Sequence, residues 1–127
     1  MDEPRPVLCV EDNDANFALI QLVLESTSLW KVARAIDVDD ARLALEERRP
    51  DVILLDLDLP GISGLELARE LKSSQRWREI PIVVVSASVM QQEHAQAREA
   101  GCEFFIEKPF DIEALRALVA RAVEAPR

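Results

Sequence analysis

Two carboxylates, Asp56 and Asp58, stand one residue apart in the stretch VILLDLDLPG, directly after a run of four apolar residues. An unpaired carboxylate is costly to bury, so we expect the pair where the apolar run surfaces and cations can approach. Other apolar runs of the chain are also followed directly by charged or hydroxyl side chains. These side chains are Glu11, Asp12, Ser86 and Lys108.

This set of groups is suited to binding a phosphoryl group beside a divalent cation. Three carboxylates at one place cannot all stay ionised unless a cation joins them. Oxygen ligands without clustered histidines or cysteines favour Mg²⁺, with Mn²⁺ as the alternative. Lys108 adds a positive charge and Ser86 a hydroxyl donor for phosphoryl oxygens. The nucleophile would then be a carboxylate, and Asp56 is the candidate, so the product would be an aspartyl phosphate.

These groups can meet if the apolar runs are neighbouring strands of a parallel sheet. Several of the runs are continuous rather than alternating, which is typical of parallel strands covered on both faces. The expected strands are Val7 to Val10, Trp30 to Ala35, Val52 to Leu55, Ile82 to Val85 and Phe104 to Ile106.

Segments with apolar residues at three- and four-residue spacing lie between and after these runs. Asn13 or Asp14 is expected to cap the first helix and Asp37 the second, while two later helices follow Gly64 and Asp111. The expected inner faces are Phe17, Ile20, Val23 and Leu24; Val38, Ala41 and Leu45; Leu65, Ala68 and Leu71; and Ile112, Leu115, Leu118, Val119 and Ala122.

A fifth helix, from about Val89 to Ala100, is the weakest, because alanines form much of its inner face; Gly101 should end it. Alternating strands and helices predict a (βα)5 doubly wound, flavodoxin-like α/β fold. Its five-stranded parallel sheet has the expected order 2-1-3-4-5, with helices on both faces. All carboxyl ends then lie on one edge, where the candidate side chains converge.

The composition is typical of a globular domain and argues against several classes of function. The 127 residues, 49% hydrophobic and 31% charged, predict one domain over 1–127 with a core from about 6 to 124. No stretch has the length of a membrane span or of a signal peptide, so a cytoplasmic location is expected. The net charge of −9 argues against direct binding of nucleic acid.

Several reactive or aromatic side chains have structural interpretations. Cys9 and Cys102 lack metal or disulfide spacing and are expected to be reduced packing residues. His94 lies in the polar run QQEHAQAR, so a solvated helix face is favoured over a phosphate carrier. Phe104 and Phe105 are expected in the last strand, pointing away from one another, with the ring nearer the surface able to move. No glycine-rich nucleotide-binding motif is present.

Blocks of sequence, in order along nearly the whole chain, resemble the receiver domain of response regulators in two-component signalling. The blocks are VLCVEDND, PDVILLDLDLPGISGLEL, IPIVVVSAS and GCEFFIEKPF. VEDN followed by Asn16 is similar to stand-alone cell-cycle or chemotaxis-type regulators and to receivers of hybrid kinases.

The resemblance implies a role for each candidate side chain. Asp56 would be the phosphoacceptor, and Lys108 and Ser86 would contact the phosphoryl group. The implied ligands of Mg²⁺ are Glu11, Asp12, Asp56 and the main-chain carbonyl of Asp58. Asp58 and Ser88 occupy positions that tune dephosphorylation in the family. Such a domain is not an enzyme beyond catalysing its own phosphorylation and autodephosphorylation.

The resemblance also implies a switch and partners. The Lys108–Pro109 peptide bond is expected to be cis, and Phe105 would turn inward with Ser86. This turn would change a face formed by the fourth helix, fifth strand and fifth helix, which would bind a target protein. The phosphoryl donor would be a sensor histidine kinase or histidine phosphotransfer protein, docked on the first helix near Asn13 and Asn16.

Two other functions stay open from the sequence. The D-x-D of DLDL also resembles phosphatases of the haloacid dehalogenase type, in which the second Asp is a general acid. That motif normally ends the first strand, whereas here it ends the third expected strand. The other alternative is a pseudo-receiver that binds a partner without phosphorylation, although no acceptor, lysine or acid is missing.

Overall fold

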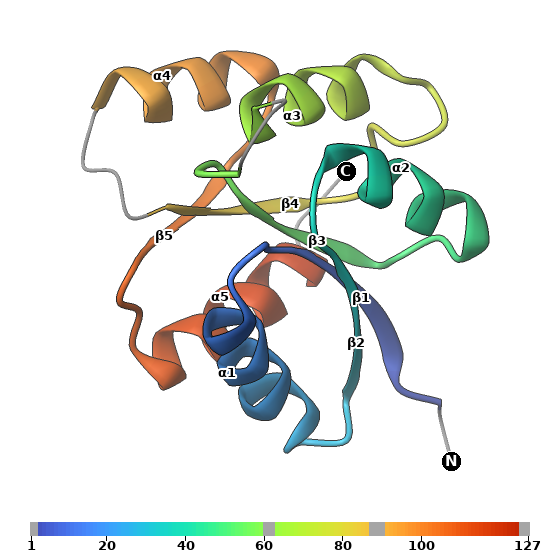
Figure 1. The fold of residues 1–127 in the computed structure, drawn as a ribbon, viewed down its shortest axis with the longest axis vertical. Helices are drawn as coiled ribbons and strands as arrows, with labels where there is room; N and C mark the ends of the chain where they lie inside the picture. Colours follow the sequence, from blue (N-terminus) through green and yellow to red (C-terminus); the bar gives the residue numbers. More distant parts are fainter. Residues whose placement is uncertain (1–2, 60–62, 87–90, 125–127) are drawn as a thin grey trace.

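Within the described residues, five strands alternate with five helices, as the sequence predicts (Figure 1). The computed structural model of the protein describes residues 3–59, 63–86 and 91–124, with the backbone alone for 91–93. The strands are β1 (Arg5–Val10), β2 (Trp30–Ala35), β3 (Val52–Asp56), β4 (Ile82–Ser86) and β5 (Phe104–Glu107). The helices are α1 (Asp14–Glu25), α2 (Val38–Glu47), α3 (Gly64–Ser73), α4 (Gln91–Ala100) and α5 (Ile112–Glu124).

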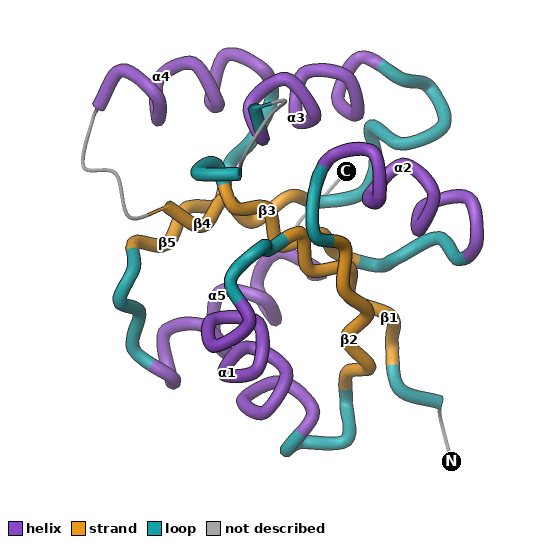
Figure 2. The backbone as a smooth tube through the Cα atoms, viewed as in Figure 1, coloured by secondary structure: helices purple, strands orange, loops and turns teal. Residues whose placement is uncertain are grey.

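The strands pair in the order β2-β1-β3-β4-β5 and every pair is parallel, which confirms the predicted doubly wound sheet. In Figure 2 the strands form a middle layer, with α1 and α5 on one face and α2, α3 and α4 on the other. β3 and β4 are buried along their whole length because helices cover both of their faces. The carboxyl ends of the strands therefore lie on one edge of the sheet.

Two hydrophobic cores lie on the two faces of this sheet. Ile53 and Leu55 of β3 pack in the core with α2, α3 and α4, whereas Leu54 packs in the core with α1 and α5. Phe104 and Phe105 divide in the same way, with Phe104 against the α1–α5 core and Phe105 against the other. The expectation that the two rings point away from one another is confirmed.

The ends of the helices follow the residues that the sequence indicates. The side chain of Asn13 accepts the N–H of Asn16 at the start of α1, and Asp37 accepts that of Asp40 at the start of α2. Gly101 directly follows α4 with a φ of +112°, in the region that glycine adopts most easily.

The inner faces of α3 and α5 differ from the prediction at particular positions. Leu67 is fully buried in α3, where the pattern selected Leu65, which is half-buried. Ile112 is 43% exposed because it is the first residue of α5, and the half-buried Phe110 before it packs against the α1–α5 core instead. Val123, at the other end of α5, is buried.

Helix α4 has little buried surface, as its sequence predicts. Among its described side chains, 94–100, Ala97 alone is buried. The predicted start at Val89 lies outside the described residues. None of the helices in the described ranges has the length and apolar character needed to cross a membrane.

Both cysteines are buried and free, in agreement with the prediction. Burial raises the pKa of the Cys102 thiol to about 11. Burial, together with the charge of Glu11, raises the pKa of the Cys9 thiol further. The two residues therefore act as apolar packing groups, since a neutral thiol is a poor nucleophile.

Candidate metal and phosphoryl site

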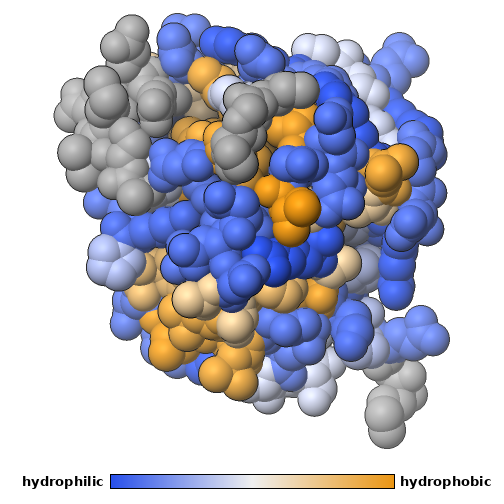
Figure 3. All heavy atoms as spheres, viewed as in Figure 1, coloured by the Kyte–Doolittle hydropathy of each residue, from blue (hydrophilic) through white to orange (hydrophobic). Residues whose placement is uncertain are grey.

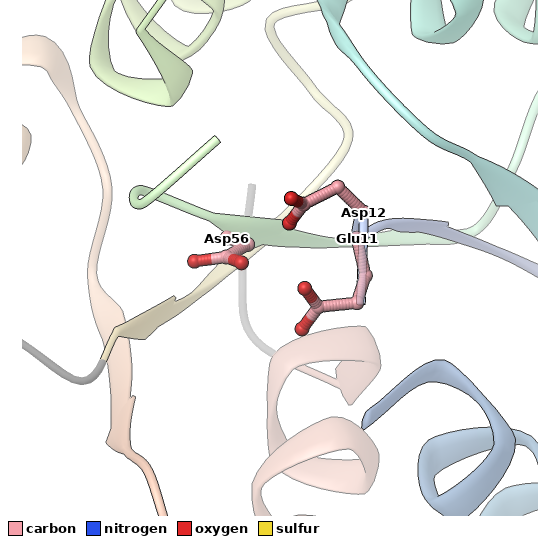
Figure 4. A group of neighbouring side chains, drawn as sticks. All are labelled: Glu11, Asp12 and Asp56. Carbon is pink, nitrogen blue, oxygen red and sulfur yellow. The ribbon is translucent and has the colours of Figure 1, made fainter. Parts of the chain in front are cut away.

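Three carboxyl groups meet where β1 and β3 end, at the carboxyl edge of the sheet (Figure 4). Glu11, Asp12 and Asp56 each offer an oxygen that lies within 4.8 Å of the others. Glu11 and Asp56 are buried, at 1% and 2% exposure, whereas Asp12 is exposed. The structure thus brings together the three carboxylates that the sequence predicts to share a site.

Lys108 reaches this cluster from the chain that follows β5. Its Nζ lies 2.9 Å from Asp56 Oδ2 and 3.0 Å from Glu11 Oε1, and its side chain is 14% exposed. Burial lowers the pKa of the Lys108 ammonium, but its contacts with Asp56 and Glu11 outweigh burial and raise the pKa above the usual value. Lys108 therefore stays charged. The Lys108–Pro109 peptide bond is cis, as expected.

Glu11 is the carboxylate with the most unusual environment. Its Oε2 accepts the N–H of Asn13 at 3.2 Å. Its Oε1 is fully buried, and no described donor is oriented to hydrogen-bond it, although Lys108 pairs with its charge. Burial, followed by the bond and charge of Asp56, raises the pKa of Glu11 to about 7. A buried oxygen that lacks a hydrogen bond is available to a cation.

Asp56 is the last residue of β3, and its two oxygens have different partners. Oδ1 accepts the backbone N–H of Asp58 at 2.8 Å, while Oδ2 pairs with Lys108. Alternation along a strand would turn the Asp58 side chain toward the site only if β3 continued to residue 58. β3 ends at Asp56 instead, and Asp58 is exposed.

Gly64, which the sequence indicates only as the residue before a helix, lies against the acceptor residue. A Cβ at this glycine would stand 2.4 Å from the backbone oxygen of Asp56 and 3.1 Å from the Cα of Leu57. Helix α3 can therefore begin this close to the end of β3 because its first residue has no side chain. The sequence around this glycine, Gly-Leu-Glu-Leu, gives no sign of the contact with Asp56.

Ser86 ends β4 beside the cluster, at 1% exposure, and its carbonyl accepts the N–H of Lys108 at 2.9 Å. This bond joins the ends of β4 and β5. The structure therefore places Ser86 at the end of β4 and Lys108 directly after the neighbouring strand β5, as predicted. Ser88, the second predicted hydroxyl, lies outside the described residues.

Phe105 lies half-buried between the sheet and α4. Its ring centroid is 5.3 Å from that of His94, and the guanidinium of Arg98 lies 4.8 Å from it. The prediction of a solvated His94 is corrected by this contact, since His94 is half-buried against the ring. One turn of α4 separates His94 from Arg98, so both side chains reach the same aromatic face.

Arg34 of β2 is a second residue that the sequence analysis missed. Its guanidinium donates to the backbone carbonyls of Glu11 and Asp12, at 3.0 and 3.1 Å. In the sheet Arg34 pairs with Cys9, two residues before Glu11, and the sequence predicts that the two strands are neighbours but does not predict this register. A cation at this position is next to the end of β1 in the predicted sheet.

These residues fit a small divalent cation. The donors are oxygens alone, which Mg²⁺ and Mn²⁺ prefer. The buried Oε1 of Glu11 has room in its bonding for a further partner. The charges of Glu11, Asp12 and Asp56 exceed that of Lys108, so a cation would relieve the repulsion that remains.

Comparison with known proteins agrees with the fold. The sequence profile described as the response regulator receiver domain matches residues 7–120. The polar-differentiation response regulator DivK of Brucella anthropi is 36% identical over 109 residues, which are 86% of this chain and 88% of that protein.

Solved structures show the same architecture. A putative response regulator from Chloroflexus aurantiacus has a TM-score of 0.90 at 26% identity, covering 96% of this chain and 99% of that chain. The receiver domain of sensor histidine kinase PA1611 from Pseudomonas aeruginosa has a TM-score of 0.86 at 29% identity, over 96% and 99% of the two chains. That structure has a magnesium ion coordinated in its active site cleft. The present chain therefore belongs to the response regulator receiver domains of two-component systems.

Proposed function

We propose that this receiver accepts a phosphoryl group on Asp56 from a phosphohistidine of a sensor histidine kinase or histidine phosphotransfer protein. The observation that carries the proposal is the pairing of the buried Asp56 with Lys108 at 2.9 Å, beside two further carboxylates. No described residue other than these offers an acceptor at the same edge with both a cation and an acidic cluster around it. The domain over 1–127 would act in the cytoplasm, in a two-component or phosphorelay pathway.

The proposed metal ligands are Glu11, Asp12, Asp56 and the main-chain carbonyl of Asp58. Bound Mg²⁺, or Mn²⁺ in its place, would neutralise charge that develops on the phosphoryl oxygens during transfer. Asp58 is held close to the site because its N–H donates to Asp56. The oxygen-only donor set supports this assignment, as does the buried Oε1 of Glu11, which has an ion pair with Lys108 but no hydrogen bond from a described donor.

In the proposed transfer, a carboxylate oxygen of Asp56 attacks phosphorus as the bond from phosphorus to the imidazole nitrogen breaks. The nitrogen keeps that electron pair and takes up a proton, and the new O–P bond forms the aspartyl phosphate. Lys108 pairs with a phosphoryl oxygen through the ammonium that now contacts Asp56, and the Ser86 hydroxyl donates to another. In a second displacement, water would attack phosphorus, the bond from phosphorus to the Asp56 oxygen would break, and phosphate would leave at a rate that Asp58 and Ser88 tune.

The proposed output is a change in the face made by α4, β5 and α5, which would bind a target protein. Phe105 links this face to the site because it pairs with Val84, two residues before Ser86 in β4, and packs on α4. A shift of Ser86 toward a phosphoryl group would open space for the ring, and Pro109 would fix the direction of the chain after Lys108. The expected effect is that α4 presents a different set of side chains to the target protein.

The donor would dock beside the site on α1. Leu19 and Leu22 of α1 are 40% and 69% exposed, and α5, which contacts α1, begins at the exposed Ile112. Figure 3 shows hydrophobic side chains gathered on this part of the surface, next to the hydrophilic band at the edge of the sheet. An apolar surface of this kind suits the face of a partner helix.

Phosphorylation with a small donor tests the proposal. Incubation with acetyl phosphate and Mg²⁺ should give one phosphoryl adduct in the mass spectrum, and Asp56→Asn should not acquire it. Rapid turnover of varied phosphate esters would instead identify a phosphatase of the haloacid dehalogenase type. Absence of any adduct, from acetyl phosphate and from phosphorylated kinase alike, would identify a pseudo-receiver that binds without phosphorylation.

A further inference from the structure

The guanidinium of Arg34 is bound to the loop that carries two of the three carboxylates. Nε donates to the carbonyl of Glu11 at 3.0 Å, and Nη2 donates to the carbonyl of Asp12 at 3.1 Å. Nη1 pairs with Asp14 Oδ1 at 2.8 Å, in the first turn of α1. The ring of Phe17 lies 5.1 Å from the guanidinium carbon. One side chain of β2 thus contacts four residues between the end of β1 and the first turns of α1.

The position of these contacts matters because the strand ladder stops here. The last bond between the ends of β1 and β2 is from the Glu11 N–H to the Ala35 carbonyl, at 2.9 Å. Beyond it, the carbonyls of Glu11 and Asp12 accept from Arg34. A guanidinium is planar, so two donors in fixed geometry set the orientation of the peptide between the two carbonyls.

Arg34 and Lys108 act on Glu11 in different ways. Lys108 contacts a carboxylate oxygen of Glu11, which a metal ion would also need. Arg34 contacts the main-chain oxygen of the same residue and leaves the carboxylate of Glu11 available. The phenyl ring of Phe17 and the carboxylate of Asp14 orient the guanidinium from its other sides.

We infer that Arg34 is a positioning residue for the divalent cation: it holds the Glu11–Asp12 peptide so that both carboxylates are aimed at Asp56 before the ion arrives. The ion then binds without the cost of ordering this loop. The inference rests on the proposed function only in taking Glu11, Asp12 and Asp56 as metal ligands.

Coulomb's law and positioning predict opposite signs for the loss of this residue. Arg34→Gln removes a positive charge close to a cation site, and charge alone would tighten the binding of Mn²⁺ or Mg²⁺. Positioning predicts weaker binding, by roughly tenfold, which is the size usual for residues that orient metal ligands. The direction of the change therefore separates the two effects.

The measurement is the dissociation constant of Mn²⁺, followed by the electron paramagnetic resonance signal of the free ion, with Mg²⁺ as competitor. We expect Arg34→Gln to bind roughly tenfold more weakly than the parent protein. Arg34→Lys keeps the positive charge but loses the planar guanidinium with its two donors in fixed geometry. It should therefore recover less than half of the binding free energy that Arg34→Gln loses. Arg42→Gln is the matched control, because Arg42 pairs with Asp39 and Glu70 on the exposed surface, and its affinity should equal that of the parent protein.

Phosphorylation distinguishes failure of this inference from failure of the proposed function. With acetyl phosphate, Arg34→Gln should need more Mg²⁺ for half-maximal adduct but reach the parent level at saturating Mg²⁺. A variant that binds Mn²⁺ as tightly as the parent protein, or more tightly, overturns the positioning role. If Arg34→Gln does not fold, Arg34→Lys decides, since parental affinity in that variant would overturn the role as well. Metal binding without any adduct would instead count against phosphorylation at Asp56.

Discussion

Helices α1 and α4 lie on opposite faces of the sheet, and the structure holds them by different means. α1 buries Ile20, Val23 and Leu24, begins at a capping asparagine, and follows a loop that Arg34 binds through its backbone. α4 buries Ala97 alone among its side chains at 94–100 and contacts β5 through His94 and Arg98.

The difference separates two tasks within one domain. Side chains that must bind an ion and a phosphoryl group with fixed geometry come from well-packed elements, which hold them in place before the ligand binds. An element that must respond needs two arrangements close in free energy, and weak packing provides this. The contact of Phe105 with α4 is made by one ring and two polar side chains, so a small change at Ser86 could alter it.

The largest effect on stability should follow the loss of the Lys108 ammonium, which balances the buried charges at the ends of β1 and β3. Lys108→Met leaves Glu11 and Asp56 buried without it, so the unfolding free energy at pH 8 without metal should fall by about 3 kcal/mol. Urea unfolding with and without 10-fold excess Mg²⁺ over its dissociation constant measures this loss, and added Mg²⁺ should return part of it.

Lys31→Met is the control for Lys108→Met, because Lys31 is exposed on β2 and should change stability by less than about 0.5 kcal/mol. Equal losses in the two variants would show that the acidic cluster does not depend on its lysine.

The next largest effect is expected where α3 meets the acceptor residue. Gly64→Ala places a Cβ against the backbone oxygen of Asp56, which cannot move aside as a flexible side chain would. We expect a loss of about 1–3 kcal/mol in unfolding free energy and a slower gain of the phosphoryl adduct.

Gly101→Ala is the matched control for the Gly64 variant. It introduces strain at a φ of +112°, and its Cβ would meet the flexible side chain of Lys72 at 3.3 Å, far from the acidic cluster. It should lower stability by about 1 kcal/mol without slowing phosphorylation. Parental phosphorylation kinetics in Gly64→Ala would show that the contact with Asp56 has no bearing on the acceptor.

The pattern of residues predicts the elements of this site better than the contacts that hold it. The apolar runs and their order place Glu11, Asp12, Asp56, Ser86 and Lys108 on one edge, because parallel topology forces the carboxyl ends together. Arg34 and Gly64 could not be found in the same way. Their roles depend on close contacts with backbone atoms at the ends of other strands, and such contacts leave no periodic pattern.

The same limit explains the correction at His94, and it also applies at Asp58. The orientation of Asp58 depends on where β3 ends, which the turn after it decides. His94 lies in a polar run whose local pattern indicates a solvated face. Its contact with Phe105 depends on how α4 packs over β5, and one weakly amphipathic helix does not specify that packing.

A third prediction concerns the pH dependence of stability and of Mg²⁺ affinity, whose direction follows from the raised pKa of Glu11. Burial raises its pKa from 4.5 to about 7, so the folded protein holds a proton that the unfolded chain has lost between these values. Stability without metal should therefore fall as pH rises from about 4.5 to 7, and level off above. Mg²⁺ must displace that proton, so its affinity should rise between pH 6 and pH 8.

Urea unfolding and Mn²⁺ titration at pH 5, 6, 7 and 8 test both directions. Glu11→Gln cannot titrate, and its stability should be less dependent on pH within this window. A parent protein whose stability rises steadily from pH 5 to 8, in parallel with that of Glu11→Gln, would contradict the raised pKa.

The smallest effect is expected on the weakly packed side. Arg98→Ala removes the cation that lies over the Phe105 ring, a contact at an exposed site that should be worth about 0.5–1 kcal/mol. The ring should then move more freely, while the Mn²⁺ affinity stays at the parent value because Arg98 does not contact the acidic cluster.

A fluorine label on the phenylalanines, assigned by Phe105→Leu, reports this motion as a sharper resonance. Arg121→Ala on the exposed side of α5 is the control. An unchanged resonance in Arg98→Ala would mean that His94 and the core hold the Phe105 ring without Arg98. Helix α4 would then be coupled to β5 more firmly than the burial of Ala97 alone among residues 94–100 indicates.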